Sequence, residues 1–124
     1  MRLSGIAKVI VATTDAALAA DAYGRGFGLE VGAASVDEDR GVLSVVCRPP
    51  KGGIIEPVSA IDTSREFAQD IACMVKEKGE GIYALVLCAE DPRSAASVLR
   101  SRGLDLSETT GIETSVFGTR ILIE

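Results

Sequence analysis

Two apolar stretches of the chain are built alike, and each runs into an aspartate. Residues 8–15 read KVIVATTD and residues 84–91 read ALVLCAED. Runs rich in β-branched residues and leucine are typical of strands. An aspartate in front of alanine-rich sequence is typical of a helix start, and Pro92 also suits a first helical turn. The pattern predicts two strands, followed by helices over residues 16–24 and 92–102.

The similarity continues beyond these helices, so the chain contains a weak internal repeat. Each helix stops at glycine and leads into a related segment, GLEV at 28–31 and GLDL at 103–106. Each half closes on a strand that ends in glutamate, GIIE at 53–56 and RILIE at 120–124. The order predicts two βαβββ modules, and we expect them to form a single domain. The expected boundaries are residues 1–124 for the domain, 5–60 for module one and 80–124 for module two.

A third helix is predicted between the modules, over about residues 63–78. Residues 63–66 read TSRE, which resembles a capping box, and Gly79 ends the segment. Apolar residues at helical spacing give this linker helix one apolar face: Phe67, Ile71, Met74 and Val75. Further strands are expected near 28–34, 41–48, 104–108 and 114–117, with a loop or hairpin turn at 48–53.

The predicted fold class is α+β, with two modules forming a curved mixed sheet around a cup. Side chains alternate across a strand, so one face of each strand would pack under the module helices and the other would line the cup. The residues expected under the helices are Val9, Val11, Leu85 and Leu87. Those expected in the cup are Lys8, Ala84, Glu56 and Glu124. Tyr23 and Tyr83 are expected in the core, with Tyr83 facing the helices.

Composition narrows the function classes. The chain is 47% apolar and 25% charged with a net charge of −5. Nucleic acids and anionic membranes require a basic surface, so neither is expected as a partner. No apolar run approaches the ~18 residues that span a bilayer, and no targeting segment is apparent. Cys47, Cys73 and Cys88 lack CxxC spacing and are expected to be free buried thiols in the cytoplasm.

The 124 residues include no histidine. This removes the usual general base near neutral pH and the commonest ligand of transition metals. Any chemistry has to use carboxylates, Lys, Arg, Tyr, Cys or Ser.

Over nearly its whole length the chain resembles the vicinal oxygen chelate superfamily, which includes glyoxalases, bleomycin-resistance proteins and extradiol dioxygenases. The resemblance is carried by four stretches: VIVATTD at 9–15 with FGLE at 27–30, GIIEPVS at 53–59, GEGIYALVL at 79–87 through Asp91, and RGL at 102–104. In metal-dependent members, the first strand of each module carries a histidine, and the closing strand carries Glu or Gln. The histidine positions match Lys8 and Ala84, and the carboxylate positions match Glu56 and Glu124.

The resemblance implies a small organic molecule as ligand and a homodimer as the assembly. Without the histidines we expect no bound metal and no cofactor, because transition metals favour imidazole and thiolate ligands. We hypothesise that Lys8 takes the place of the metal by neutralising Glu56 or Glu124. The other glutamate would then be free to act as a base with a raised pKa.

The candidate catalytic residues are therefore Lys8, Glu56 and Glu124. The side chains expected to line the cup and bind the ligand are Ile10, Ile54, Ala84, Val86, Cys88 and Leu122. Arg40, Arg48 and Lys51 flank the expected mouth, where they could meet an anionic ligand or be ordinary solvated charges.

Three functions remain open at this point. The first is a metal-free binding protein that holds a small, partly apolar molecule unchanged. The second is an isomerase, epimerase or lyase that acts next to a carbonyl with a glutamate base, either metal-dependent or with Lys8 in place of the metal. In the third, side chains fill the cup and the protein is an interaction module.

Overall fold

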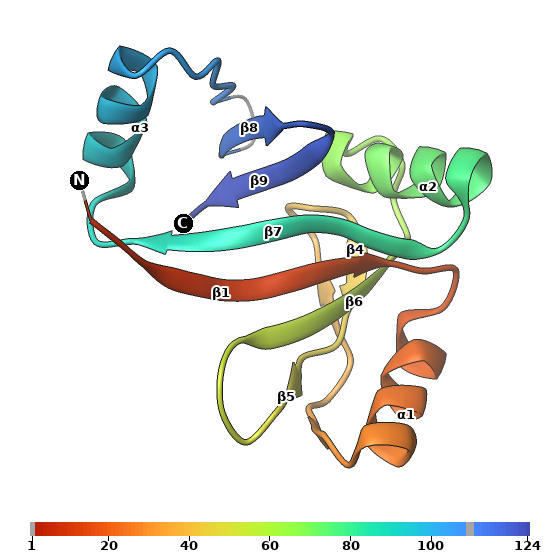
Figure 1. Ribbon diagram of the computed structural model, residues 1–124. Coiled ribbons are helices and arrows are strands. Elements are labelled where there is room, and N and C mark those ends of the chain that lie inside the picture. The colour runs from red at the N-terminus through yellow and green to blue at the C-terminus, as the bar shows by residue number, and fades with distance from the viewer. Residues whose placement is uncertain (1, 109–110) are drawn as a thin grey trace.

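Two long strands run antiparallel through the middle of the computed structural model and join its two halves (Figure 1). They are β1 (Leu3–Ala12) and β7 (Gly81–Ala89). Each also pairs in parallel with the closing strand of its own half: β1 with β6 (Ile54–Ala60), and β7 with β9 (Thr119–Ile123). The structure describes residues 2–108 and 111–124.

All strands of these residues belong to one nine-stranded mixed sheet. Its main order is β2-β5-β6-β1-β7-β9-β8, and the β3–β4 hairpin is attached to β6 through β4. The shorter strands are β2 (Glu30–Val31), β3 (Ser35–Asp37), β4 (Val42–Ser44), β5 (Cys47–Arg48) and β8 (Ile112–Val116). The predicted α+β class with a mixed sheet is confirmed.

Helices α1 (Ala16–Phe27) and α3 (Pro92–Ser101) begin at the two predicted aspartate caps. The carboxylate of Asp15 accepts a hydrogen bond from the backbone N–H of Leu18 at 3.1 Å. Asp91 accepts one from the N–H of Ser94 at 3.3 Å. Each cap satisfies a backbone donor that the helix itself leaves without a partner.

Helix α1 runs three residues beyond the predicted end at Gly24 and stops before Gly28, whose φ of 68° is left-handed. Gly24 has a packing role, because a Cβ atom there would lie 2.9 Å from Cγ2 of Val31. A helical glycine can serve close approach of a neighbouring strand as well as mark a helix end. The sequence pattern alone does not separate the two.

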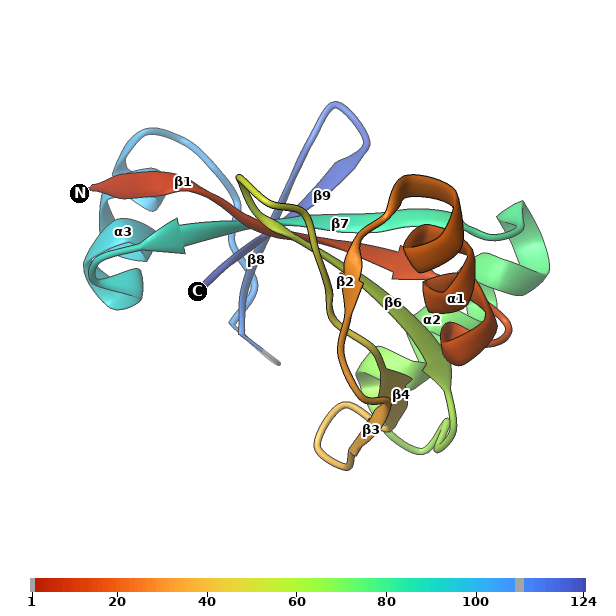
Figure 2. The same ribbon diagram turned by 90° about the horizontal axis from the view of Figure 1, so that it is seen from below.

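Helix α2 (Glu66–Lys78) joins the two halves along the chain and packs mainly against β6, behind which it lies in Figure 2. The predicted capping box at 63–66 is wrong, because Arg65 is the N-cap and its side chain makes no capping hydrogen bond. Asp62 instead accepts hydrogen bonds from the backbone N–H and the hydroxyl of Ser64, at 3.0 and 2.6 Å. The serine and threonine are therefore used in a turn before the helix.

Several strand predictions need correction. Residues 28–34 contribute only the two-residue β2, and residues 41–48 are divided into β4 and β5. Residues 35–37 form a strand that was not predicted. Residues 104–108 contribute a single bridge, between Ser107 and Glu113. Among the described residues, α1 is therefore followed by the five strands β2 to β6, and α3 by β8 and β9.

The linker helix packs on the cup face of the sheet. Its Ala68 and Ile71 are fully buried against Ile10, Ala12 and other sheet residues in one core cluster. Smaller clusters lie beneath α1 and α3, and Tyr23 packs against the first of them as expected. Part of the predicted cup is therefore filled by α2.

The three cysteines differ in their burial. Cys47 is buried, but Cys73 and Cys88 are exposed, so the prediction of three buried thiols is wrong for two of them. Cys73 lies on α2 and Cys88 near the end of β7.

Among the helices of the described residues, none combines the length and the apolar sequence needed to cross a membrane.

Candidate functional site

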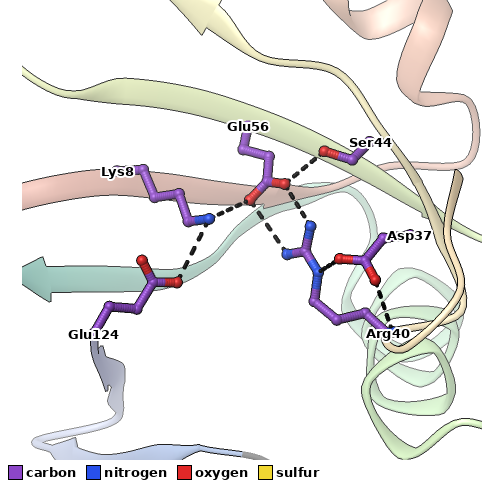
Figure 3. A network of polar contacts seen from close by, with 6 residues as sticks. All are labelled: Lys8, Asp37, Arg40, Ser44, Glu56 and Glu124. Carbon is purple, nitrogen blue, oxygen red and sulfur yellow. Dashed lines mark hydrogen bonds and ion pairs between the residues drawn. The ribbon is translucent and has the colours of Figure 1, made fainter. Parts of the chain in front are cut away.

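Lys8 lies between the two predicted glutamates (Figure 3). Its Nζ is 3.2 Å from Oε1 of Glu56 and 3.6 Å from Oε1 of Glu124. The parallel register of β1 and β6 pairs Lys8 with Ile54 and Ile10 with Glu56. Lys8 and Glu56 are thus diagonal neighbours on one face, within reach of long side chains.

Glu124 reaches the same place from the other half of the chain. Val86 on β7 is the register partner of both Lys8 and Leu122. Glu124 lies two residues beyond Leu122, and its backbone is held by β7: its N–H donates to the carbonyl of Leu87 at 3.0 Å, and its carbonyl accepts from Ala89 at 2.7 Å. The structure therefore brings all three candidate catalytic residues together.

Glu56 is held from its other side by Arg40 and Ser44 (Figure 3). The guanidinium of Arg40 donates to both carboxylate oxygens, at 3.3 and 2.6 Å, and the hydroxyl of Ser44 donates to Oε2 at 2.5 Å. Glu56 is only 3% exposed. Both oxygens are thus engaged in charge-assisted contacts with neighbours, which is the arrangement a buried carboxylate requires.

The turn between β3 and β4 positions Arg40. Asp37 accepts from the backbone N–H of Arg40 at 3.1 Å and from its Nε at 2.6 Å. Gly41 closes the turn with a φ of 74°, and a Cβ atom there would lie 2.5 Å from the carbonyl oxygen of Asp62. From the sequence, Arg40 was expected as a charge near the mouth and not as a partner of Glu56. The three-residue spacing of Asp37 and Arg40 was the feature of the sequence that could have indicated a turn stabilised by this pair.

These contacts set the ionisation of Glu56. Burial raises its pKa, but hydrogen bonds from Arg40 and Ser44, with the positive charges of Arg40 and Lys8, outweigh burial and hold the pKa below its ordinary value. The expectation of a base with a raised pKa is therefore wrong for Glu56. It is a carboxylate kept ionised by its partners.

A cavity of about 150 Å³ adjoins this network, with Arg40 and Glu124 in its wall. Its apolar lining comes from sheet and linker helix together: Ile10, Phe67, Tyr83, Ile112, Leu122 and Ile123. Glu66, Asp70 and Glu113 add further carboxylates. The cavity is the part of the cup that α2 leaves open.

The six predicted ligand-binding residues lie in different places. Ile10 and Leu122 line the cavity. Ala84 and Val86 are buried in the core cluster beneath α2, Ile54 is half-buried, and Cys88 is exposed. Arg48, at the end of β5, and Lys51, on the β5–β6 connection, are exposed and do not line this cavity.

Tyr83 lines the cavity, although strand alternation predicted that it faces the module helices. The register of β1 and β7 shifts at this point: Ile10 pairs with Ala84 and Val11 with Ile82, which leaves Tyr83 as an extra residue. Such a bulge interrupts simple alternation. Tyr83 is buried and packs edge-on against Phe67, with ring centroids 5.4 Å apart.

Three carboxylates of the cavity wall were not predicted from the sequence. Glu66 and Asp70 lie one turn apart on α2, and Glu113 lies on β8. Burial first, and then the charges of Asp70 and Glu66, raise the pKa of Glu113. The spacing of Glu66 and Asp70 was visible in the sequence, but which face α2 turns to the cup was not.

Within residues 2–108 and 111–124, no group of three or more His, Cys, Asp or Glu side chains is placed to hold a metal ion. Between Glu56 and Glu124, Lys8 presents an ammonium group to both carboxylates. An ammonium group cannot act as a metal ligand while protonated.

No protein-family model matches the sequence, and no curated protein matches it either. Solved structures do match the fold. Methylmalonyl-CoA epimerase from Mycobacterium tuberculosis superposes with a TM-score of 0.80 at 19% identity, over 98% of this chain and 87% of that one. A variant of the Streptomyces coelicolor epimerase, in complex with 2-nitronate-propionyl-CoA, gives 0.78 at 15% identity, over 98% and 96%.

A third solved structure is a methylmalonyl-CoA epimerase in complex with methylmalonyl-CoA and NH4+, with a TM-score of 0.74 and 16% identity, over 98% of this chain and 94% of that one. At these identities the likeness concerns the fold. The chain has the fold of these epimerases.

Proposed function

We propose that this protein is a glyoxalase- or bleomycin-resistance-like binding protein of the vicinal oxygen chelate superfamily. It holds a small, partly apolar organic molecule in the cup, beside Lys8, Glu56 and Glu124. The observation that carries the proposal is the cavity of about 150 Å³, in which an apolar wall meets the charged network at Arg40 and Glu124. A cavity of ~150 Å³ accommodates a benzene-sized group.

The contacts and the lowered pKa of Glu56 favour a binding role over a catalytic role for this residue. A general base near neutral pH needs a pKa close to the working pH. The pKa of Glu56 is lowered and both of its oxygens are engaged by Arg40, Ser44 and Lys8. In this proposal Glu56 anchors the cup wall, and Glu124 and Arg40 face the ligand.

We further propose that the cup works without a metal ion. A divalent cation between Glu56 and Glu124 would compete with Lys8 for both carboxylates and would meet the like charges of Lys8 and Arg40. Hard cations need six or more oxygen ligands, or several waters. The donor set therefore does not fit such an ion. The epimerase solved with methylmalonyl-CoA and NH4+ supports the view that this fold accommodates an ammonium cation.

A methyl NMR titration tests the binding function. The labelled protein is titrated with benzyl alcohol, benzylamine and benzoate, and the methyl signals of Ile10, Ile112 and Leu122 are followed. Binding in the cup moves these signals and leaves those of Val31, at the far end of the sheet, in place. Leu122→Phe fills the cavity and should abolish the response. The proposal fails if no probe moves these signals, or if Leu122→Phe responds like the unmodified protein.

The alternative is an isomerase, epimerase or lyase that acts next to a carbonyl. The fold of the solved epimerases favours it, as do Glu124 and Glu113, two carboxylates in the cavity wall. One would take the proton from the carbon beside the carbonyl. Incubation with methylmalonyl-CoA in D2O tests this, because turnover would place deuterium on that carbon. Exchange that Glu113→Gln or Glu124→Gln abolishes would favour the enzyme; binding without exchange would favour the binding protein.

We also propose a homodimer located in the cytoplasm, each chain forming one domain with modules near 5–60 and 80–124. Exposed apolar side chains on the central strands support an interface: Leu3 and Ile6 on β1, and Ile82 on β7. Light scattering after size exclusion should give twice the chain mass, and Ile6→Glu should shift it toward the monomer. A monomeric unmodified protein would contradict this part of the proposal.

A further inference from the structure

The cavity has a strong charge preference as well as an apolar wall. Its charged lining residues are Arg40, Glu66, Asp70, Glu113 and Glu124. The ion-pair partners of these residues are Lys8, Asp37, Glu56 and Arg120. In this part of the described chain, three cationic side chains face six carboxylates. The environment of the cavity is therefore anionic.

The cations near the cavity are already engaged. Arg40 contacts Asp37 at 2.6 Å and Glu56 at 2.6 Å, and Lys8 bridges Glu56 and Glu124. Arg120 lies 3.6 Å from Asp70. An anionic ligand would have to compete with these carboxylates for every positive charge, at a cost in desolvation and repulsion.

Two carboxylates of the cavity wall have no cationic side chain paired with them in the described part of the chain. Glu66 and Glu113 form no ion pair within the described residues. Both line the same cavity, and the charges of Asp70 and Glu66 add to burial in raising the pKa of Glu113. Carboxylates that repel one another around a cavity are stabilised when a cation enters it.

From the cavity and its charge together, we infer that the ligand is a small organic cation, with one ammonium group paired to Glu113 and Glu66 and an apolar body against Ile10, Phe67 and Leu122. This inference rests on the proposed binding function and specifies its ligand class. It differs from the CoA esters bound by the solved neighbours, which are anionic.

The aromatic rings of the cavity wall are not free to recognise the cation. The guanidinium of Arg40 lies 5.1 Å from the ring centroid of Phe67, and that of Arg120 lies 4.2 Å from that of Tyr83. Each ring already has a cationic partner. Recognition of an ammonium group therefore depends on the two carboxylates, which makes their removal a decisive test.

Three probes of nearly the same shape separate charge from apolar fit: benzylamine, benzyl alcohol and benzoate. In the titration followed at Ile10 and Leu122, near neutral pH and low salt, benzylammonium should bind at least about tenfold more tightly than benzyl alcohol, a difference of ~1.4 kcal/mol. Benzoate should bind more weakly than either.

Matched variants assign the charge preference to its residues. Glu113→Gln and Glu66→Gln should each weaken benzylammonium binding by roughly three- to tenfold and leave benzyl alcohol unchanged. Glu30→Gln makes the same charge change on the exposed β2, at the opposite end of the sheet order from β8, and should leave both affinities unchanged.

The outcomes separate this inference from the binding function. If benzyl alcohol or benzoate binds in the cavity as tightly as benzylammonium, the cation inference is overturned and the binding function stands. The same follows if Glu113→Gln and Glu66→Gln weaken benzylammonium no more than Glu30→Gln does. If none of the three probes moves the cavity signals, both are overturned.

Discussion

The ammonium nitrogen of Lys8 lies 3.2 Å from the carboxylate of Glu56, a side chain with only 4% of its surface exposed. The pair joins β1 to β6, and through Glu124 it connects to the second half of the chain. A buried carboxylate without partners would cost several kcal/mol. Lys8, Arg40 and Ser44 together offset that cost and fix the wall of the cup.

Replacement of Glu56 by glutamine should lower the free energy of unfolding by roughly 3 kcal/mol, because Arg40 and Lys8 would lose the anion that compensates them. Urea denaturation near neutral pH measures this. Glu30→Gln, on an exposed strand, is the matched control and should change stability by less than about 0.5 kcal/mol. A loss for Glu56→Gln no larger than that of the control would refute the anchoring role.

Stability should depend on pH through the same residue. The pKa of Glu56 in the folded protein is below its ordinary value of 4.5, so its contribution is fully present above about that pH. As the pH falls through the lowered pKa, the folded carboxylate takes up a proton and the contribution disappears. Urea unfolding at a series of pH values should show the difference between unmodified protein and Glu56→Gln shrinking in acid. A difference that stays constant with pH would contradict this.

Arg40→Lys should destabilise the protein by about 2 kcal/mol despite the conserved charge. Lysine cannot donate to both oxygens of Glu56 while also binding Asp37, and it loses the contact of the guanidinium group with the Phe67 ring. Thermal unfolding of the variant is the measurement, with Arg25→Lys as control because the Arg25 side chain is 83% exposed. Equal melting temperatures for the two variants would show that the geometry of Arg40 is unimportant.

Glu113→Gln should have the opposite effect and stabilise the ligand-free protein near neutral pH by about 0.5 kcal/mol, as expected when like-charge repulsion is relieved. The pKa of Glu113 is raised by burial and by Asp70 and Glu66. A raised pKa means that its favourable contribution is present below the ordinary value of 4.5 and is lost as the pH rises through the folded pKa. The gain in the free energy of unfolding of Glu113→Gln should therefore vanish in acid. Urea unfolding at a series of pH values measures it, with Glu90→Gln as the control. Destabilisation at neutral pH would contradict the assignment.

Much of the charged network could be predicted from sequence because strand geometry is regular. Alternation along a strand places residues two apart on one face, so Lys8 and Ile10 share a face, as do Leu122 and Glu124. The internal repeat then related the two closing strands, and the structure brings their glutamates to the same ammonium group.

The parts of the site that were not predicted depend on contacts between segments that are distant in the sequence. Arg40 reaches Glu56 from a tight turn whose shape depends on Asp37 and on the close approach of Gly41 to Asp62. Tyr83 enters the cavity because of a bulge that no residue pattern marks. Local sequence does not specify these features, since each is fixed by packing against another part of the chain.

The most direct test is a crystal structure of the protein soaked in Mn²⁺, with anomalous diffraction data collected for the metal. We expect the Lys8 ammonium group between Glu56 and Glu124 and no anomalous peak among the three side chains. A strong peak bridging the two carboxylates, with Lys8 displaced from them, would contradict it.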